Sequence, residues 1–96
     1  MLNSKQRAKL RSLANTMETI LQIGKGGITK ETVKQAEDAL KARELIKCKV
    51  LETAPYTVRE AAEKLSGMTA AETVQTIGTK FVLYKQNPEK PVIVLK

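Results

Sequence analysis

Residues 20–34 read ILQIGKGGITKETVK: an apolar run, then three glycines within four residues, then a helical pattern. The segment TILQI at 19–23 is rich in β-branched residues and ends at a glycine, which predicts a strand. Thr29 is placed to cap a helix, and the apolar face of that helix carries Val33, Ala36 and Leu40. A strand, a glycine loop and a helix in this order indicate an α/β domain.

Two further elements flank this unit. Ser4 is a candidate cap for a helix over about 5–14, with an apolar stripe of Leu10, Leu13 and Met17. The segment ELIKCKVLE at 44–52 alternates in polarity, which predicts a strand. One face of that strand would be apolar, and the other, carrying Lys47 and Lys49, would be wet and basic.

The second half supplies one helix and a hairpin. Thr57 and Glu60 form a capping-box pattern for a third helix, which Gly67 would terminate. The segment ETVQTIGTKFVLYK at 72–85 predicts two strands around a tight turn at Gly78-Thr79. The aromatic residues of this segment, Phe81 and Tyr84, are expected in the core.

These elements predict a single α/β domain over residues 1–85, in the order α-β-α-β-α-β-β. The expected architecture is a small four-stranded mixed sheet with three helices, in which strand–helix–strand units make right-handed parallel crossovers. Residues 86–96 contain two prolines ahead of an apolar end, so we expect a C-terminal tail that could add an edge strand.

Composition restricts the function. With 96 residues, 42% of them hydrophobic, the chain is long enough for one core and too short for two. It has no histidine and a single cysteine, Cys48, which removes the usual general base, an internal disulfide and a Cys/His metal cluster. No segment resembles a signal peptide or a bilayer span. We expect a cytoplasmic protein that is not an enzyme and uses no membrane, metal, cofactor or small-molecule substrate.

Charge favours a polyanionic partner. The formal net charge is +7, and residues 1–49 hold eleven Lys/Arg against five Asp/Glu, whereas residues 50–96 hold six against five. The first helix is especially basic, and its i, i+4 pairs Lys5/Lys9 and Arg7/Arg11 place like charges together. An excess of this kind is typical of nucleic-acid-binding domains.

The glycine loop fits neither of two familiar nucleotide motifs. A P-loop needs Lys-Ser/Thr after its second spaced glycine, and a dinucleotide fingerprint needs a glycine where this chain has Thr29. Glu44 lies 20 residues after Gly24, but it precedes a strand instead of following one. A nucleotide-dependent enzyme is therefore a weak interpretation.

The same residues satisfy the shorter GxxG pattern, in which bare backbone lets a polynucleotide approach and amides meet its phosphates. The loop opens onto a helix N-terminus, which favours an anion, and Lys25 and Lys30 add positive charge. Glycines at such a junction also serve simply as tight turns, so a structural interpretation stands beside the functional one.

The segments KQRAKLRSLAN, LQIGKGGIT, ELIKCKVLE and VQTIGTKFVLYK together resemble, in order and spacing, the YhbY/CRM domain family of RNA-binding proteins, over about residues 2–85. The resemblance implies RNA binding without catalysis and a fold like the C-terminal domain of bacterial translation initiation factor three. It further implies ribosomal RNA as the partner, during assembly of the large ribosomal subunit. The chain departs from the usual family pattern at Asn15, Cys48 and Thr79, none of which lies in the glycine loop.

The resemblance and the charge pattern together nominate an RNA-binding site. Its candidate residues are Gly24, Lys25, Gly26, Gly27, Lys5, Arg7, Lys9, Arg11, Lys30 and Lys34. The first helix would form one continuous positive surface with the glycine loop if it packs beside that loop. The alternative is a protein-interaction domain that docks an acidic partner through its basic face.

Overall fold

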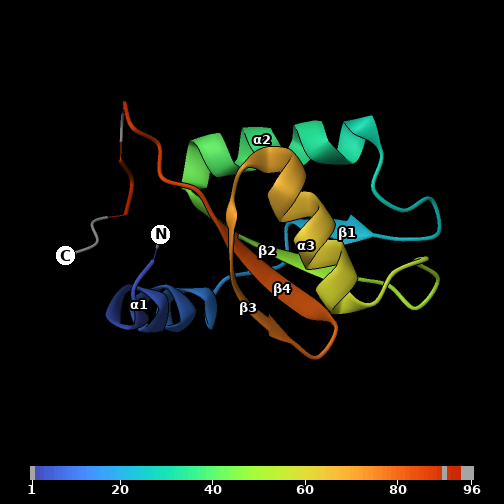
Figure 1. Cartoon of the computed structure of the whole chain (residues 1–96), viewed down its shortest axis with the longest axis horizontal. Helices are drawn as coiled ribbons and strands as arrows, with labels where there is room; N and C mark the ends of the chain where they lie inside the picture. Colours follow the sequence, from blue (N-terminus) through green and yellow to red (C-terminus); the bar gives the residue numbers. More distant parts are fainter. Residues whose placement is uncertain (1, 90, 94–96) are drawn as a thin grey trace.

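The computed structural model describes residues 2–89 and 91–93 and contains the expected elements in the expected order (Figure 1). They are α1 (Ser4–Ala14), β1 (Leu21–Ile23), α2 (Lys30–Arg43), β2 (Leu45–Val50), α3 (Val58–Thr69), β3 (Glu72–Ile77) and β4 (Lys80–Tyr84). No helix within the described residues is long and apolar enough to cross a lipid bilayer.

The strands form one mixed sheet in the order β1-β2-β4-β3. β1 and β2 are parallel and are joined through α2, whereas β4 is antiparallel to both of its neighbours. The β3–β4 hairpin turns at Gly78, whose φ of 58° lies in the left-handed region that glycine tolerates. The parallel crossover and the hairpin confirm the predicted mixed sheet.

The main core lies between the sheet and helices α2 and α3. Ile46, Cys48 and Phe81 are fully buried there against Ala36, Leu40 and the apolar face of α3. Burial raises the pKa of the Cys48 thiol to about 12, so this cysteine behaves as a small apolar residue and not as a reactive thiol. The prediction that Phe81 is a core residue is confirmed.

A second, smaller core lies on the opposite face of the sheet, where α1 packs. Leu10 and Ala14 of α1 contact a cluster formed by the sheet residues Leu45, Val74, Val82 and Tyr84. The prediction of a simply wet, basic face is therefore wrong for the part of the sheet that α1 covers. Lys47 is half-buried on this face, and its Nζ donates to the carbonyl oxygen of Ala14 at 3.0 Å, which caps the C-terminus of α1.

The boundaries of α1 differ slightly from the prediction. Asn3, not Ser4, is the N-cap, because its side chain accepts from the Gln6 amide while the Gln6 side chain accepts from the Asn3 amide. Leu10 is buried and Met17 packs against the same cluster as predicted, but Leu13, the third residue of the predicted stripe, is 40% exposed. The helix ends at Ala14, and the pair that faces the sheet is Leu10 and Ala14 at i, i+4 spacing.

Helix α3 continues through Gly67, so the prediction that Gly67 ends this helix is wrong. The buried face extends from Leu65 to Thr69, and the Thr69 hydroxyl donates to the Leu65 carbonyl oxygen at 2.8 Å. The helix stops at Ala70, which adopts a left-handed conformation with φ of 57°. The burial of Thr69 explains why the last turn forms despite an internal glycine.

The tail forms no strand over residues 86–89 and 91–93, so the edge strand is not found there; positions 90 and 94–96 lie outside the described residues. This part of the tail folds back onto Glu44, whose side chain is fully buried. The Glu44 carboxylate accepts from the backbone amides of Asn87, Val92 and Ile93, each at 2.6 Å. Burial by itself raises the pKa of Glu44, but these three donors outweigh it and hold that pKa below the usual value.

Candidate nucleic-acid interface

The glycine loop is a tight turn at the carboxyl end of β1. The Gly27 amide donates to the Gly24 carbonyl oxygen at 3.0 Å, which leaves Lys25 and Gly26 at the tip. Both tip residues are exposed. The loop therefore presents one lysine and one stretch of bare backbone to the outside.

The fold constrains the three glycines of the loop to different degrees. A Cβ atom on Gly27 would lie 3.0 Å from the Tyr56 hydroxyl oxygen, and the φ of Gly27 is 71°, so both space and backbone conformation favour glycine. A Cβ atom on Gly24 would lie 3.4 Å from Cδ1 of Leu51, a close but ordinary contact. A Cβ atom on Gly26 would meet nothing within 4 Å. Folding therefore explains Gly27 and leaves Gly26 without a structural reason.

The N-terminus of α2 follows the loop directly. Thr29 caps the helix as predicted, accepting from the Thr32 amide at 3.2 Å while the Thr32 hydroxyl accepts from the Thr29 amide. Lys30 and Lys34 are exposed in the first turns of the helix. The positive end of the helix dipole and these lysines lie near Lys25 in the chain and favour an anion at this end of the domain.

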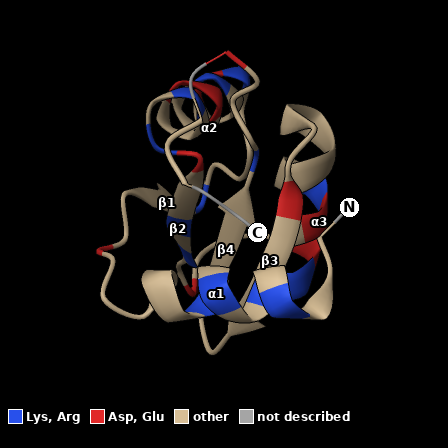
Figure 2. Cartoon of the chain, turned by 90° about the vertical axis from the view of Figure 1, so that its left-hand side faces the viewer, with Lys and Arg blue, Asp and Glu red and all other residues tan. Residues whose placement is uncertain are grey.

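The basic residues of α1 are not beside this loop. α1 lies on the sheet face opposite to α2 and α3, and Figure 1 places α1 at one end of the long axis and the loop between β1 and α2 at the other. Figure 2 shows the basic segments of α1 and α2 on opposite sides of the strands. Lys5, Lys9 and Arg11 are exposed but cannot join the glycine loop in one continuous surface, so that expectation is wrong.

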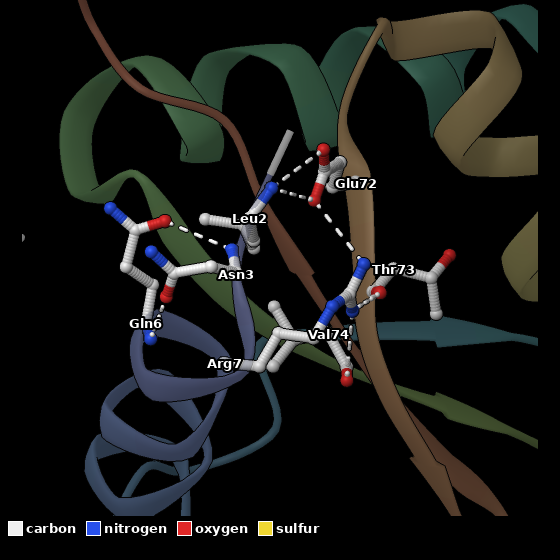
Figure 3. Close-up of polar contacts among 7 residues, drawn as sticks. All are labelled: Leu2, Asn3, Gln6, Arg7, Glu72, Thr73 and Val74. Carbon is white, nitrogen blue, oxygen red and sulfur yellow. Dashed lines mark hydrogen bonds and ion pairs between the residues drawn. The ribbon is translucent and has the colours of Figure 1, made fainter.

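Arg7, the fourth predicted basic residue of α1, holds the helix to β3 (Figure 3). Its Nη1 donates to the Thr73 carbonyl oxygen at 2.8 Å, and its Nη2 lies 3.4 Å from Oε2 of Glu72. The Glu72 carboxylate also accepts from the Leu2 amide. The Arg7 guanidinium is thus part of the α1–β3 contact, which sequence spacing alone did not indicate.

Tyr56 contacts the glycine loop, and the sequence analysis did not predict this contact. It precedes α3, packs against Gly27 and has the Lys64 ammonium 5.4 Å from its ring centroid. Residues this far apart in the chain carry no local signal of such a contact. Glu44, in contrast, lies at the other end of α2, where it binds the tail amides, so it plays no part near the glycine loop.

Residues 2–89 and 91–93 give little support to a metal site. No group of three or more His, Cys, Asp or Glu side chains within them could hold a metal ion. The exposed features at the loop end are lysines, bare backbone and a helix N-terminus, which together suit a phosphate chain.

The family model for the CRS1/YhbY (CRM) domain matches residues 2–85, nearly the entire chain. The chain belongs to this CRM domain family. The family is non-enzymatic, in agreement with the absence of a catalytic motif in the sequence.

Individual relatives support the assignment of this CRM domain. The chain is 43% identical over 95 residues to a Bacillus subtilis protein named "Probable RNA-binding protein YqeI", with 99% of both chains covered. It is 33% identical over 91 residues to a Haemophilus influenzae protein named "RNA-binding protein", covering 95% of this chain and 92% of the relative. The solution structure of a Staphylococcus aureus protein matches with a TM-score of 0.82, 46% identity and full coverage of both chains. The fold is therefore that of a solved relative.

Proposed function

We propose that this CRM domain binds RNA, with the exposed tip Lys25–Gly26 meeting the phosphate backbone. The observation that carries the proposal is the difference between the glycines: the fold constrains Gly27 through its φ and its contact with Tyr56, whereas Gly26 faces open space. A glycine without a structural reason, beside an exposed lysine and a helix N-terminus, suits close approach of a polynucleotide. Membership of the CRM family and the names of its relatives support RNA as the polyanion.

Lys30 and Lys34 extend the loop site along the first turns of α2. The exposed α1 residues Lys5, Lys9 and Arg11 form a second, separate contact surface, because the sheet lies between α1 and α2. An RNA that reaches both surfaces must wrap the domain or present two separate segments. A folded RNA of ribosomal size can do so, whereas a short hairpin seated on the glycine loop cannot.

We further propose that the bound RNA is ribosomal and that the protein acts on an immature large subunit. The support is the resemblance of the whole domain to stand-alone bacterial members of the family, together with a surface suited to structured RNA. Recognition depends mainly on phosphates and shape, because Phe81 and Tyr84 are buried and Tyr56 is the one aromatic side chain of the three that is partly exposed, too few to stack several bases.

Gradient sedimentation of a cell lysate, with and without ribonuclease, tests this role. Co-migration with a large-subunit precursor that ribonuclease abolishes is the expected result. Gly26→Asp is the matched variant, since it blocks the tip without filling occupied space. A particle association that survives ribonuclease would overturn the RNA proposal in favour of an acidic protein partner.

A further inference from the structure

A row of four side chains crosses the sheet at the end nearest the glycine loop. Gln22 of β1 pairs with Lys49 of β2, Lys49 pairs with Lys80 of β4, and Lys80 pairs with Ile77 of β3. Residues paired in register project to the same side of a sheet. All four therefore lie on the face that α1 packs against, because Lys47 on that face bonds α1 and Lys49 follows it by two residues.

Helix α1 does not cover this row. Its buried residues contact Leu45, Val74, Val82 and Tyr84, which occupy the other end of the same face. Gln22 is exposed, Ile77 is 60% exposed, and both lysines are only partly buried. The row is thus an open strip of sheet beside the one that α1 covers.

The two lysines face each other, and the strand positions next to them on this face carry no acidic residue. Lys49 and Lys80 are direct cross-strand partners, an arrangement in which like charges destabilise a sheet. The residues beside them on the same face are Gln22, Ile77, Lys47 and Val82, none of which is acidic. Within the described part of the chain, neither lysine side chain makes a hydrogen bond or ion pair. A bound anion would relieve this repulsion.

The row is continuous with the glycine loop. β1 runs from Gln22 through Ile23 directly into Gly24, and Cδ1 of Leu51, which follows β2, lies 3.4 Å from the point where a Cβ atom on Gly24 would stand. Lys49 is therefore the cross-strand partner of a residue only two positions before the loop. The positive surface that extends from the loop runs across this end of the sheet instead of onto α1.

We propose that Lys49 and Lys80 form a second phosphate-contact site for the same RNA strand that meets the glycine loop. This inference rests on the proposed RNA-binding function and deepens it. The strand would pass from Lys25 at the loop tip across Gln22 to the paired lysines. RNA is favoured over an acidic protein because the strip leads along β1 into the glycine loop, whose exposed tip carries the bare backbone of Gly26 and suits a phosphate chain.

The test measures binding of a labelled RNA hairpin across a salt series, with Lys49→Gln, Lys80→Gln and the double variant. Each lost phosphate contact should reduce the slope of log affinity against log salt by about one, and lower the affinity about eightfold at 0.1 M salt. Lys41→Gln, an exposed lysine at the far end of α2, is the matched control and should change neither. The single variants should also raise the melting temperature at low salt, because they remove the Lys49–Lys80 repulsion.

The outcomes separate the two proposals. If Lys25→Gln reduces the slope and the double variant does not, the glycine loop binds RNA and the paired lysines are excluded. If the wild-type protein binds no RNA, both proposals fail. Loss of binding to poly-glutamate with unchanged RNA affinity in the double variant would assign the strip to an acidic protein.

Discussion

The hydroxyl oxygen of Tyr56 lies 3.0 Å from the point where a Cβ atom on Gly27 would stand. The loop that opens onto α2 is thereby locked to the segment that opens onto α3, although 29 residues separate the two positions. Tyr56 supports the base of the glycine loop, and the tip at Lys25 and Gly26 stays outside. Gly27 thus packs against Tyr56, whereas the neighbouring Gly26 stays exposed at the tip.

Gly27→Ala is expected to lower the free energy of unfolding by about 2 kcal/mol, because alanine must adopt a left-handed conformation and displace Tyr56. Urea denaturation measures the loss. Gly26→Ala is the control and should change stability by less than about 0.5 kcal/mol. Equal losses at the two positions would show that the whole loop is structurally constrained.

Gly26→Asp is expected to weaken RNA binding at least tenfold while the protein keeps its wild-type melting temperature. The added carboxylate repels phosphate at the tip and occupies space that is open in the folded domain. Fluorescence anisotropy with a labelled RNA and a thermal melt of the same sample give the two readouts. A lowered melting temperature would assign Gly26 to folding instead.

The effects of Lys25→Gln and Arg11→Gln on the salt dependence of binding should depend differently on the size of the RNA. Lys25→Gln should reduce the salt slope by about one for both a short hairpin and ribosomal RNA. Arg11→Gln should do so only for ribosomal RNA, because α1 lies across the sheet from the loop. Filter binding with both RNAs distinguishes them, and an unchanged slope with ribosomal RNA would remove Arg11 from the interface.

Arg7→Gln is expected to destabilise the fold by about 1 kcal/mol, since it removes the hydrogen bond to the Thr73 carbonyl oxygen and the contact with Glu72. Lys5→Gln, on the same helix and exposed, should leave stability unchanged. Chemical denaturation of both variants makes the comparison. If the two behave alike, Arg7 does not hold α1 to β3.

Glu44 should make stability depend on pH in acid. Its pKa is held below the usual value by three backbone donors, so its contribution is complete above the unfolded-state pKa and is lost as pH falls through the folded-state pKa. Glu44→Gln should cost about 2 kcal/mol near neutral pH and flatten the decline in acid. Denaturation at several pH values tests this, and parallel curves for the two proteins would contradict it.

Much of the fold could be predicted because its signals are local. The Thr29 and Thr57 caps, the alternation of β2 and the turn at Gly78 each depend on residues within a few positions of one another. The predicted end of α3 at Gly67 was wrong because it considered local signals alone. Burial of Thr69 against other elements outweighed the local tendency of Gly67 to end a helix.

The candidate site likewise contains features that are local in the sequence and features that depend on packing. The nearness of the glycine loop to the lysines of α2 could be predicted because they are neighbours in the sequence. The placement of α1 could not, because its basic face carries no information on which side of the sheet it packs. The pairing of Lys49 with Lys80 could not be predicted either, since cross-strand register brings together residues that are 31 positions apart in the sequence.

The elements, their order, the positive charge and the GxxG loop follow from the amino-acid sequence, since periodicity, capping and composition act over short stretches of chain. The packing of Gly27 against Tyr56, the exposure of Gly26 and the separation of α1 from the loop follow from the three-dimensional arrangement alone. The binding of the tail by Glu44 follows from it as well. These relationships depend on packing between distant segments, where buried area and hydrogen-bond geometry, not local propensity, select the arrangement.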